Sequence, residues 1–368
     1  MERALKYCGN RIFNIGDFGA LYSSAAPEQW MLVCDKSFES LPEKVRDIYD
    51  EHRDNCVRFD DFEPNPKYES VVKGVELLSK SHCSLIVAIG GGSTIDVAKC
   101  IKLFFGANEE SVYFKQKPDY ELVSSINMIA LPTTAGTGSE STKHAVIYYK
   151  GVKQSICDEE IIPDAVILHP AVLEKLPLIH KKAAMLDALC QACESWWSKG
   201  SNPQSISFSE RAISDIIAFR KAYINCDRNA AESVLLAANR AGRAINITKT
   251  TAAHAMSYKL SSMYSLPHGI AVALCFPVVW KHMMRKAESE LLDVFDRIAG
   301  CFHAQSADEA VMMFENMLVE MEIDCPYSTN REQDIKLLVE SVNPERLSNN
   351  PIAFSQEELR EMYEEIVK

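Results

Sequence analysis

The stretch Gly90-Gly91-Gly92-Ser93-Thr94-Ile95-Asp96 decides the fold of the first half of the chain, because it separates an apolar run from an amphipathic one. The preceding residues 84–89 are short and apolar, as in a buried parallel strand. A strand, a glycine turn and a helix start favour binding of a diphosphate, because backbone N–H groups can approach it and the helix dipole attracts its charge. An ordinary tight turn is the alternative, since the spaced G-x-G-x-x-G fingerprint is absent.

A second loop of this kind follows the apolar run that ends at Leu131, with the sequence Pro132-Thr133-Thr134-Ala135-Gly136-Thr137-Gly138-Ser139-Glu140. Its hydroxyls and main-chain groups suit hydrogen bonds to ribose, phosphate or carboxamide groups, and a flexible surface linker is the alternative. Two such loops at the carboxyl ends of predicted strands are typical of the ligand-binding edge of a doubly wound sheet. Together they favour a nucleotide site.

Size and charge indicate a globular protein with small-molecule partners. The 368 residues have room for two domains, and 47% hydrophobic and 24% charged residues are ordinary values for a soluble protein. The formal net charge of −12, with no basic tract to offset it, argues against a nucleic-acid partner.

The twelve cysteines form no even, short disulfide framework. The one C-x-x-C pair, Cys190 and Cys193, lies inside a predicted helix without a second pair to complete a zinc site. The first residues, 1–7, lack the apolar core of a signal peptide, and no window approaches the length of a membrane span. We therefore expect a cytoplasmic protein that makes no membrane contact.

The pattern along the chain predicts two domains. Up to about residue 175, short apolar runs alternate with amphipathic stretches, which indicates parallel β/α units. The runs expected to be strands are 29–34, 84–89, 127–131, 144–149 and 164–168. From residue 176 onward long segments repeat at 3.6 residues, and the expected helices include 181–197, 205–224, 228–247, 250–263 and 289–301. We predict an α/β dinucleotide-binding domain over 1–175 and an all-α metal- and substrate-binding domain over 176–368, with the active site in the cleft between them.

Four residues of the helical half predict a metal site. Asp187 lies on an apolar helix face, where a carboxylate is costly unless charges or donors satisfy it, and Gln191 is one turn later. His254 lies on another apolar helix, and His268 begins a new one after Pro267. Each alone has an ordinary explanation, as a core amide or a hydrogen-bonded core histidine. Together they favour a divalent cation such as Fe²⁺ or Zn²⁺.

With these motifs the chain resembles the group III, metal-dependent (iron-containing) alcohol dehydrogenases, from about residue 10 to 300. The resemblance rests on Pro64-Asn65-Pro66, on 90–96 with Lys99, on 132–140, on the Asp187 helix, and on His254 followed by Pro267-His268-Gly269. It implies a Rossmann-like parallel-sheet domain and an all-α domain (the fold shared with dehydroquinate synthase), NAD(P), and one divalent metal at the substrate oxygen. Asp187, His254 and His268 match three of the family's four metal ligands.

Two positions depart from the family pattern. The family usually has histidine where this chain has Gln191, whose amide oxygen is a harder, weaker and neutral ligand. Many members have a histidine near the nicotinamide where this chain has Tyr258. Its hydroxyl can still relay a proton, although tyrosine is ordinarily a poorer base than histidine near neutral pH.

Asp35 predicts the choice of cofactor. It follows a predicted strand, where a carboxylate accepts hydrogen bonds from the adenosine ribose and repels a 2′-phosphate, so NAD(H) is favoured over NADP(H). The other residues assigned to the cofactor are Asn65, Gly90, Gly91, Gly92, Ser93, Asp96, Thr133, Thr134, Thr137, Ser139 and Lys153.

The substrate prediction rests on residues 246–258, which with Trp196-Trp197-Ser198 are similar to phosphonoacetaldehyde reductases (hydroxyethylphosphonate dehydrogenases). Lys249, Thr250 and Thr251 lie about one turn before His254 and offer a cation and two hydroxyls to an oxyanion tail. A solvated lysine at a helix start is the alternative for Lys249. We assign Lys249 and Tyr258 to catalysis.

Three functions remain open from the sequence. The first is NAD(P)H-linked reduction of a short aldehyde with an anionic tail, phosphonoacetaldehyde to 2-hydroxyethylphosphonate ahead of sulfoacetaldehyde. The second is oxidation or reduction of a plain alcohol, diol or sugar alcohol. The third is a nucleotide-binding protein whose altered ligands no longer hold a metal. We also expect a homodimer.

Overall fold

The computed structural model describes residues 11–107 and 110–368. The chain divides into two compact units, the first ending at Leu176 and the second beginning at Pro177, one residue from the boundary predicted from the sequence. The residues used to exclude a signal peptide, 1–7, lie outside the described residues.

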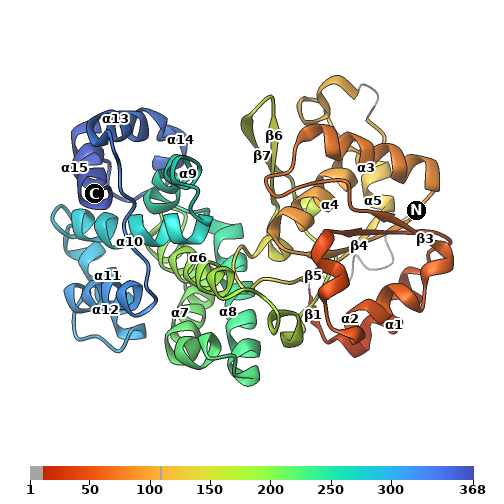
Figure 1. Cartoon of the computed structure of the whole chain (residues 1–368), viewed down its shortest axis with the longest axis horizontal. Coiled ribbons are helices and arrows are strands. Elements are labelled where there is room, and N and C mark those ends of the chain that lie inside the picture. The colour runs from red at the N-terminus through yellow and green to blue at the C-terminus, as the bar shows by residue number, and fades with distance from the viewer. Residues whose placement is uncertain (1–10, 108–109) are drawn as a thin grey trace. The chain divides into compact units, whose positions relative to one another are not determined.

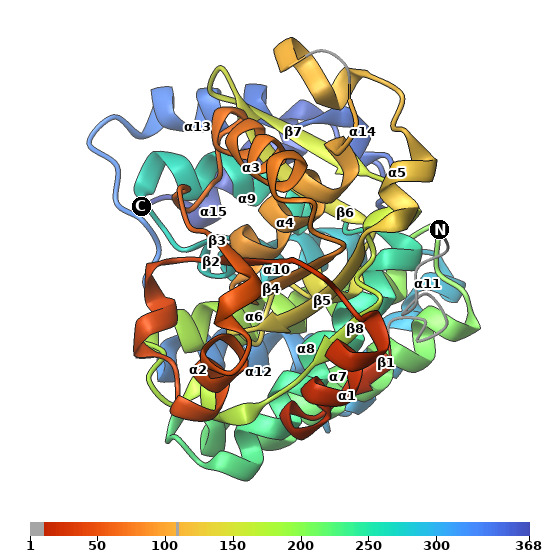
Figure 2. The same cartoon turned by 90° about the vertical axis from the view of Figure 1, so that its right-hand side faces the viewer.

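The first unit is built on a six-stranded parallel sheet with strand order β1-β8-β5-β4-β2-β3. The strands are β1 (Arg11–Phe13), β2 (Trp30–Cys34), β3 (Cys56–Phe59), β4 (Leu85–Gly90), β5 (Asn127–Pro132) and β8 (Ala165–Ile167). The helices are α1 (Phe18–Ala25), α2 (Glu43–Asp50), α3 (Tyr68–Ser81), α4 (Gly92–Phe104) and α5 (Tyr120–Ser125). Figures 1 and 2 show α1 and α2 on one face of the sheet and α3 to α5 on the other. Because both faces are covered, β2, β4 and β5 are buried along their whole length.

The prediction that residues 144–149 join the parallel sheet is wrong. They form β6 (His144–Tyr149), which pairs antiparallel with β7 (Val152–Cys157) in a separate two-stranded sheet. The turn between them contains Lys150 and Gly151, both with positive φ, as two-residue hairpin turns require. Only alternate residues of β6 are buried, which is the pattern of a strand with one covered face.

The second unit contains only helices and their connections among its residues 177–368, as predicted. They are α6 (Leu178–Trp197), α7 (Pro203–Ile224), α8 (Arg228–Thr248), α9 (Ala252–Tyr264), α10 (His268–Met284), α11 (Ser289–Cys301), α12 (Ala307–Glu320), α13 (Arg331–Ser341), α14 (Pro344–Leu347) and α15 (Gln356–Ile366). Helix α6 packs against α7, α8 and α10 and is buried on all sides from Met185 to Trp197. Its carboxylates and amides therefore need partners inside the protein.

The fold also bears on membrane spans and on the C-x-x-C pair. Within the described ranges, no helix combines the length and the apolar character that crossing a bilayer requires. Cys190 and Cys193 are buried free thiols inside α6, where they pack as small apolar groups.

Candidate nucleotide and metal sites

The glycine stretch lies at the point where the strand order of the sheet reverses. From β2 the chain goes outward to β3, and it then returns to place β4 on the other side of β2. In open α/β sheets, ligands bind at the carboxyl ends of the two strands that flank such a point. Gly90 ends β4, and Gly91 is the N-cap of α4, so the free N–H groups of that helix are found here.

Two of the three glycines are required by their neighbours. A Cβ on Gly90 would lie 2.3 Å from Oγ1 of Thr94, and one on Gly92 would lie 2.8 Å from Oγ1 of Thr137. A Cβ on Gly91 would meet nothing nearer than Thr134 at 3.6 Å, so the backbone of Gly91 is the most open part of the turn. A phosphate could approach this backbone closely.

The structure brings Asp35 to the same point. Asp35 follows β2 directly, and its Oδ2 accepts a hydrogen bond of 3.0 Å from Oγ1 of Thr94 in α4. Its Oδ1 accepts a bond of 2.8 Å from the backbone N–H of Ser37. The carboxylate is thus held beside the glycine turn, at the carboxyl ends of β2 and β4, where the strand order reverses. Its binding to a ribose stays a prediction.

The threonine-rich loop is joined to the glycine turn. The backbone N–H of Thr133 donates to the carbonyl of Gly90 at 2.9 Å. Thr134 and Thr137 are the nearest neighbours of Gly91 and Gly92.

Asp96 and Ser139 have roles that the sequence did not indicate. Oγ of Ser139 donates to one carboxylate oxygen of Asp96 at 2.5 Å, and the backbone N–H of Val146 donates to the other at 2.9 Å. Burial raises the pKa of Asp96, although Lys99 and these hydrogen bonds oppose the shift. The two side chains predicted to bind a cofactor therefore tie α4 to the threonine loop and to β6.

The remaining predicted cofactor residues are more dispersed. Ser93 is half-buried in the first turn of α4. Asn65 is exposed ahead of α3, with a φ of 57°. Lys153 is half-buried on β7, where its charge favours ionisation of Asp96.

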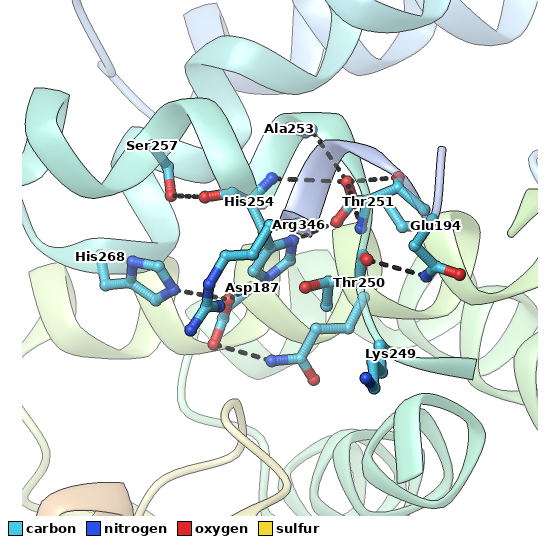
Figure 3. Close-up of polar contacts among 12 residues, drawn as sticks. Asp187, Glu194, Lys249, Thr250, Thr251, Ala253, His254, Ser257, His268 and Arg346 are labelled. Atoms are coloured by element: carbon cyan, nitrogen blue, oxygen red, sulfur yellow. Dashed lines mark hydrogen bonds and ion pairs between the residues drawn. The ribbon is translucent and has the colours of Figure 1, made fainter. Parts of the chain in front are cut away.

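In the second unit, three predicted metal ligands converge from three helices (Figure 3). Asp187 comes from the middle of α6, His254 from the first turn of α9, and His268 from the first residue of α10. Oδ1 of Asp187 lies 3.2 Å from Nε2 of His254 and 3.9 Å from Nε2 of His268. One donor atom from each side chain lies within 4.8 Å of the others.

Gly269 makes this convergence possible. A Cβ at this position would lie 1.9 Å from the carbonyl oxygen of Ala183 and 2.8 Å from Cβ of Asp187. Only glycine lets the start of α10 lie directly on α6. The preceding Pro267 is the N-cap of α10, so His268 is carried on the first turn beside Asp187.

Gln191 lies at the fourth position, one turn after Asp187 on α6. Its Nε2 donates a hydrogen bond of 3.1 Å to Oδ2 of Asp187, and the side chain is buried. Because Oδ2 is held by this amide, Oδ1 of Asp187 is the oxygen that faces the two imidazoles.

Glu194 contacts the predicted metal ligand His254, and the sequence analysis did not single it out. It is fully buried on α6, and its Oε2 contacts Nδ1 of His254 (Figure 3). Its Oε1 accepts bonds from the backbone N–H groups of Thr251 and Ala253, at 3.2 and 2.9 Å, and from Oγ1 of Thr251 at 2.7 Å. A carboxylate on Nδ1 keeps a proton there, so Nε2, which faces Asp187, is the nitrogen that can bind a cation once its own proton is lost. The signal in the sequence was a second carboxylate on the apolar face of the Asp187 helix.

The charges of this cluster fit a bound cation. Burial disfavours the charged form of His254, but Glu194 and Asp187 outweigh it and raise the pKa of His254 to about 9. Burial also opposes ionisation of Asp187, yet the two histidines lower the pKa of Asp187. The carboxylates of Asp187 and Glu194 thus favour positive charge at the position of the His254 imidazole. One carboxylate, two imidazole nitrogens and an amide oxygen would hold a divalent metal, which would act as a Lewis acid on an alcohol or aldehyde oxygen.

Tyr258 lies beside the cluster with a partner that the sequence analysis also missed. Its ring stacks on His268, with centroids 5.5 Å apart and an interplanar angle of 9°. Its hydroxyl accepts a hydrogen bond from Nη1 of Arg346, and Cζ of Arg346 lies 4.6 Å from the Tyr258 centroid. Arg346 comes from the four-residue helix α14, for which no pattern in the sequence gave a signal.

The Lys249–Thr251 segment differs from its prediction. Lys249 lies between two helices, as predicted, but it caps the end of α8 and does not begin a helix as in the alternative interpretation, and α9 begins at Ala252 rather than at residue 250. Oγ1 of Thr251 donates to Glu194 and accepts a bond of 2.9 Å from Nε1 of Trp197, so this buried hydroxyl is not available to a substrate. The side chain of Lys249 is exposed.

Comparison with known proteins places the chain in a family. The iron-containing alcohol dehydrogenase model matches residues 10–170, and the model for the C-terminal part of the Fe-containing alcohol dehydrogenase family matches residues 181–367. The NAD-dependent methanol dehydrogenase of Bacillus methanolicus is 31% identical, over 92% of this chain and 89% of that protein. The 1,3-propanediol dehydrogenase of Citrobacter freundii is 31% identical, over 72% of this chain and 70% of that protein. The chain belongs to the iron-containing alcohol dehydrogenase family.

Solved structures agree with this assignment. An iron-containing alcohol dehydrogenase from Thermococcus thioreducens has the same fold, with a TM-score of 0.86, 22% identity, and 97% of this chain and 98% of that chain covered. The sulfoacetaldehyde reductase of Bifidobacterium kashiwanohense, solved with NAD⁺, has a TM-score of 0.87 and 25% identity over 97% of this chain and 96% of that chain. Membership of this family makes the protein an oxidoreductase of the alcohol dehydrogenase type, and the third function considered from the sequence is set aside.

Proposed function

We propose that this protein reduces a short aldehyde with an anionic tail, using NADH and a divalent metal, and that its substrate is phosphonoacetaldehyde. The observation that carries this proposal is the backbone of Lys249, with φ 64° and ψ 176°. This region is almost confined to glycine, and a residue held there costs about 1–3 kcal/mol. Such strain collects at functional sites, which supports a functional role for this exposed lysine.

The surroundings of Lys249 support this interpretation. The segment is held by a bond of 2.8 Å from the backbone N–H of Lys249 to the carbonyl of Ile245 and by one of 2.9 Å from Oγ1 of Thr248 to the carbonyl of Lys249. Among the described residues, the ammonium group of Lys249 has neither a hydrogen bond nor an ion pair. Thr251, two residues on, binds the same Glu194 that holds His254. A sulfoacetaldehyde reductase among the similar structures is consistent with an anionic substrate.

The chemistry follows from the donor groups of this chain. A nicotinamide cofactor would supply hydride, and a divalent metal held here would polarise the carbonyl oxygen. Asp187, Gln191, His254 and His268 would hold the metal, Fe²⁺ or Zn²⁺. Asp35 would bind the ribose of NADH and oppose the 2′-phosphate of NADPH. The Tyr258 hydroxyl would hold the proton that the product alkoxide receives.

Reduction or oxidation of an uncharged alcohol or diol is the second candidate. It is favoured by the relatives at 31% identity, which are named for methanol and for 1,3-propanediol. We further propose that the enzyme is a cytoplasmic homodimer, and the free thiols of its eleven described cysteines are compatible with a reducing compartment.

A substrate panel tests the proposal. We expect the metal-loaded enzyme with NADH to have a higher kcat/KM for phosphonoacetaldehyde than for acetaldehyde, with sulfoacetaldehyde between them. Lys249→Ala should cost about 1.5–3 kcal/mol in kcat/KM for the anionic aldehydes, the range for a charge-assisted hydrogen bond. The matched control is Lys259→Ala, which removes an exposed lysine from α9. Equal kcat/KM for charged and uncharged aldehydes would favour the second candidate, and full activity in protein that binds no divalent metal would refute the metal site.

A further inference from the structure

We propose that Arg346 is a specificity-determining residue whose guanidinium binds the oxyanion tail of the substrate, an inference that rests on the proposed function. The ligand would be a short aldehyde bearing a phosphonate or sulfonate group.

Arg346 is held beside the metal cluster by stacking on Tyr258, which itself stacks on His268. Its guanidinium lies over the Tyr258 ring, and that ring lies parallel to His268, whose Nε2 is 3.9 Å from Asp187. Figure 3 shows the Arg346 side chain extending from its helix toward Asp187. A group that binds Arg346 would therefore lie one aromatic ring away from a metal ligand.

The segment that carries Arg346 is anchored by hydrogen bonds rather than by its own short helix. Nδ2 of Asn349 donates to the carbonyls of Thr248 and Thr250, at 2.7 and 3.0 Å. Oγ of Ser198 donates to Oδ1 of Asn349 at 3.0 Å. These carbonyls flank Lys249, so a single asparagine joins the Arg346 segment to the Lys249 loop. Both cations thus belong to one hydrogen-bonded unit.

The guanidinium has unused binding capacity. It presents a planar fork of N–H donors, and one of them bonds the Tyr258 hydroxyl. In the part of the chain that the structure describes, Arg346 makes no other hydrogen bond and no ion pair. The protein has 51 acidic residues and 39 basic ones, so a half-buried arginine without a carboxylate partner is conspicuous. Keeping such a charge partly desolvated is unfavourable unless an anion binds it.

The chemistry of the two cations suggests a division of roles. Arginine binds planar or tetrahedral oxyanions through two parallel N–H···O bonds, whereas lysine acts as a compact point charge. A phosphonate carries up to two negative charges, which Arg346 and Lys249 would neutralise together. An uncharged alcohol offers nothing to this pair, so Arg346 would select the anionic substrate class.

Two variants and a control test this role. Arg346→Gln removes the charge, and Arg346→Lys keeps the charge but loses the fork. Lys259→Gln removes a positive charge from an exposed position on α9 next to Tyr258 and controls for long-range electrostatics. The measurements are kcat and KM for phosphonoacetaldehyde and acetaldehyde, and calorimetric binding of 2-hydroxyethylphosphonate to the metal-loaded protein.

We expect Arg346→Gln to lower the ratio of kcat/KM for phosphonoacetaldehyde over acetaldehyde by about 10- to 150-fold, mainly through KM, and to weaken binding of 2-hydroxyethylphosphonate by a similar factor. Arg346→Lys should lose part of the ratio, and Lys259→Gln should change it less than twofold. If the wild type prefers anionic aldehydes and Arg346→Gln keeps that preference, the role of Arg346 is refuted while the proposed function stands. Wild-type behaviour of Arg346→Lys would refute the two-bond contact. A wild type without any preference for anionic aldehydes would refute the proposed function itself.

Discussion

Replacing Glu194 with glutamine tests how this protein prepares His254 to bind a metal. Oε1 of Glu194 accepts bonds from Thr251 and Ala253, and its Oε2 contacts Nδ1 of His254. Glutamine has the same shape but offers one acceptor oxygen and one NH₂ donor. If the oxygen stays on the N–H groups of α9, the NH₂ group faces Nδ1 of His254. Nδ1 must then accept, the ring proton moves to Nε2, and Nε2 can no longer bind a cation.

The expected loss follows from these contacts. In the opposite amide orientation the oxygen accepts from Nδ1 of His254, and the tautomer of the imidazole is preserved. The donors of Thr251 and Ala253 then face an NH₂ group, so one set of hydrogen bonds is lost in either orientation. A hydrogen bond to a charged group contributes about 1.5–3 kcal/mol, or a factor of about 10 to 150 in affinity. Loss of a partner behind a metal ligand typically costs 10- to 100-fold in metal affinity. We therefore expect Glu194→Gln to weaken binding of Fe²⁺ or Zn²⁺ by about 10- to 100-fold.

The assay is competition for the metal against a chelating dye at constant pH, with the melting temperature of the metal-free protein measured alongside. Glu232→Gln is the matched control, because Glu232 is exposed on α8 and the chemical change is the same. A folded Glu194→Gln protein whose metal affinity lies within twofold of the wild type would refute the role assigned to Glu194.

Four further predictions concern Gly269, Asp35 and His254. Gly269→Ala places a Cβ 1.9 Å from the carbonyl oxygen of Ala183 and should lower the free energy of unfolding, measured in urea, by about 3 kcal/mol. The control Gly300→Ala, with no atom within 4 Å of its Cβ, should not lower it, and equal effects of the two variants would contradict the packing argument. Asp35→Gly should raise the kcat/KM ratio of NADPH over NADH at least about fivefold, because like charges 4 Å apart repel by about 1 kcal/mol even in water, and an unchanged ratio would show that Asp35 does not face the ribose. Because the pKa of His254 is raised from 6.5 to about 9, the metal-free protein should lose stability as the pH rises through this range, where only the folded state holds the proton. Metal binding must release that proton, so metal affinity should rise about tenfold per pH unit up to pH 9, and affinity independent of pH would contradict the shift.

The sequence by itself determined the elements that depend on neighbouring residues. The apolar run before Gly90 predicted β4, and the helical spacing of apolar residues after Gly92 predicted α4. Both predictions succeed because the spacing of apolar residues along the chain shows which side chains of a strand or helix are buried. The placement of Asp187 and His254 on buried helix faces followed in the same way. Glycine at 269 was quoted from the sequence, but its reason, contact with Ala183, required the packed helices.

Only the tertiary structure decided which of these elements meet. Residues 144–149 have a strand pattern, but pairing with β7 instead of the parallel sheet depends on a turn and a partner strand that periodicity does not specify. Glu194 meets His254 across 60 residues, and Arg346 meets Tyr258 across 88. Local sequence patterns report that a side chain is buried or exposed, and they carry no information about the partner. That partner is selected when helices from distant parts of the chain pack, since a buried charge is tolerated only where packing supplies its counter-charge and donors.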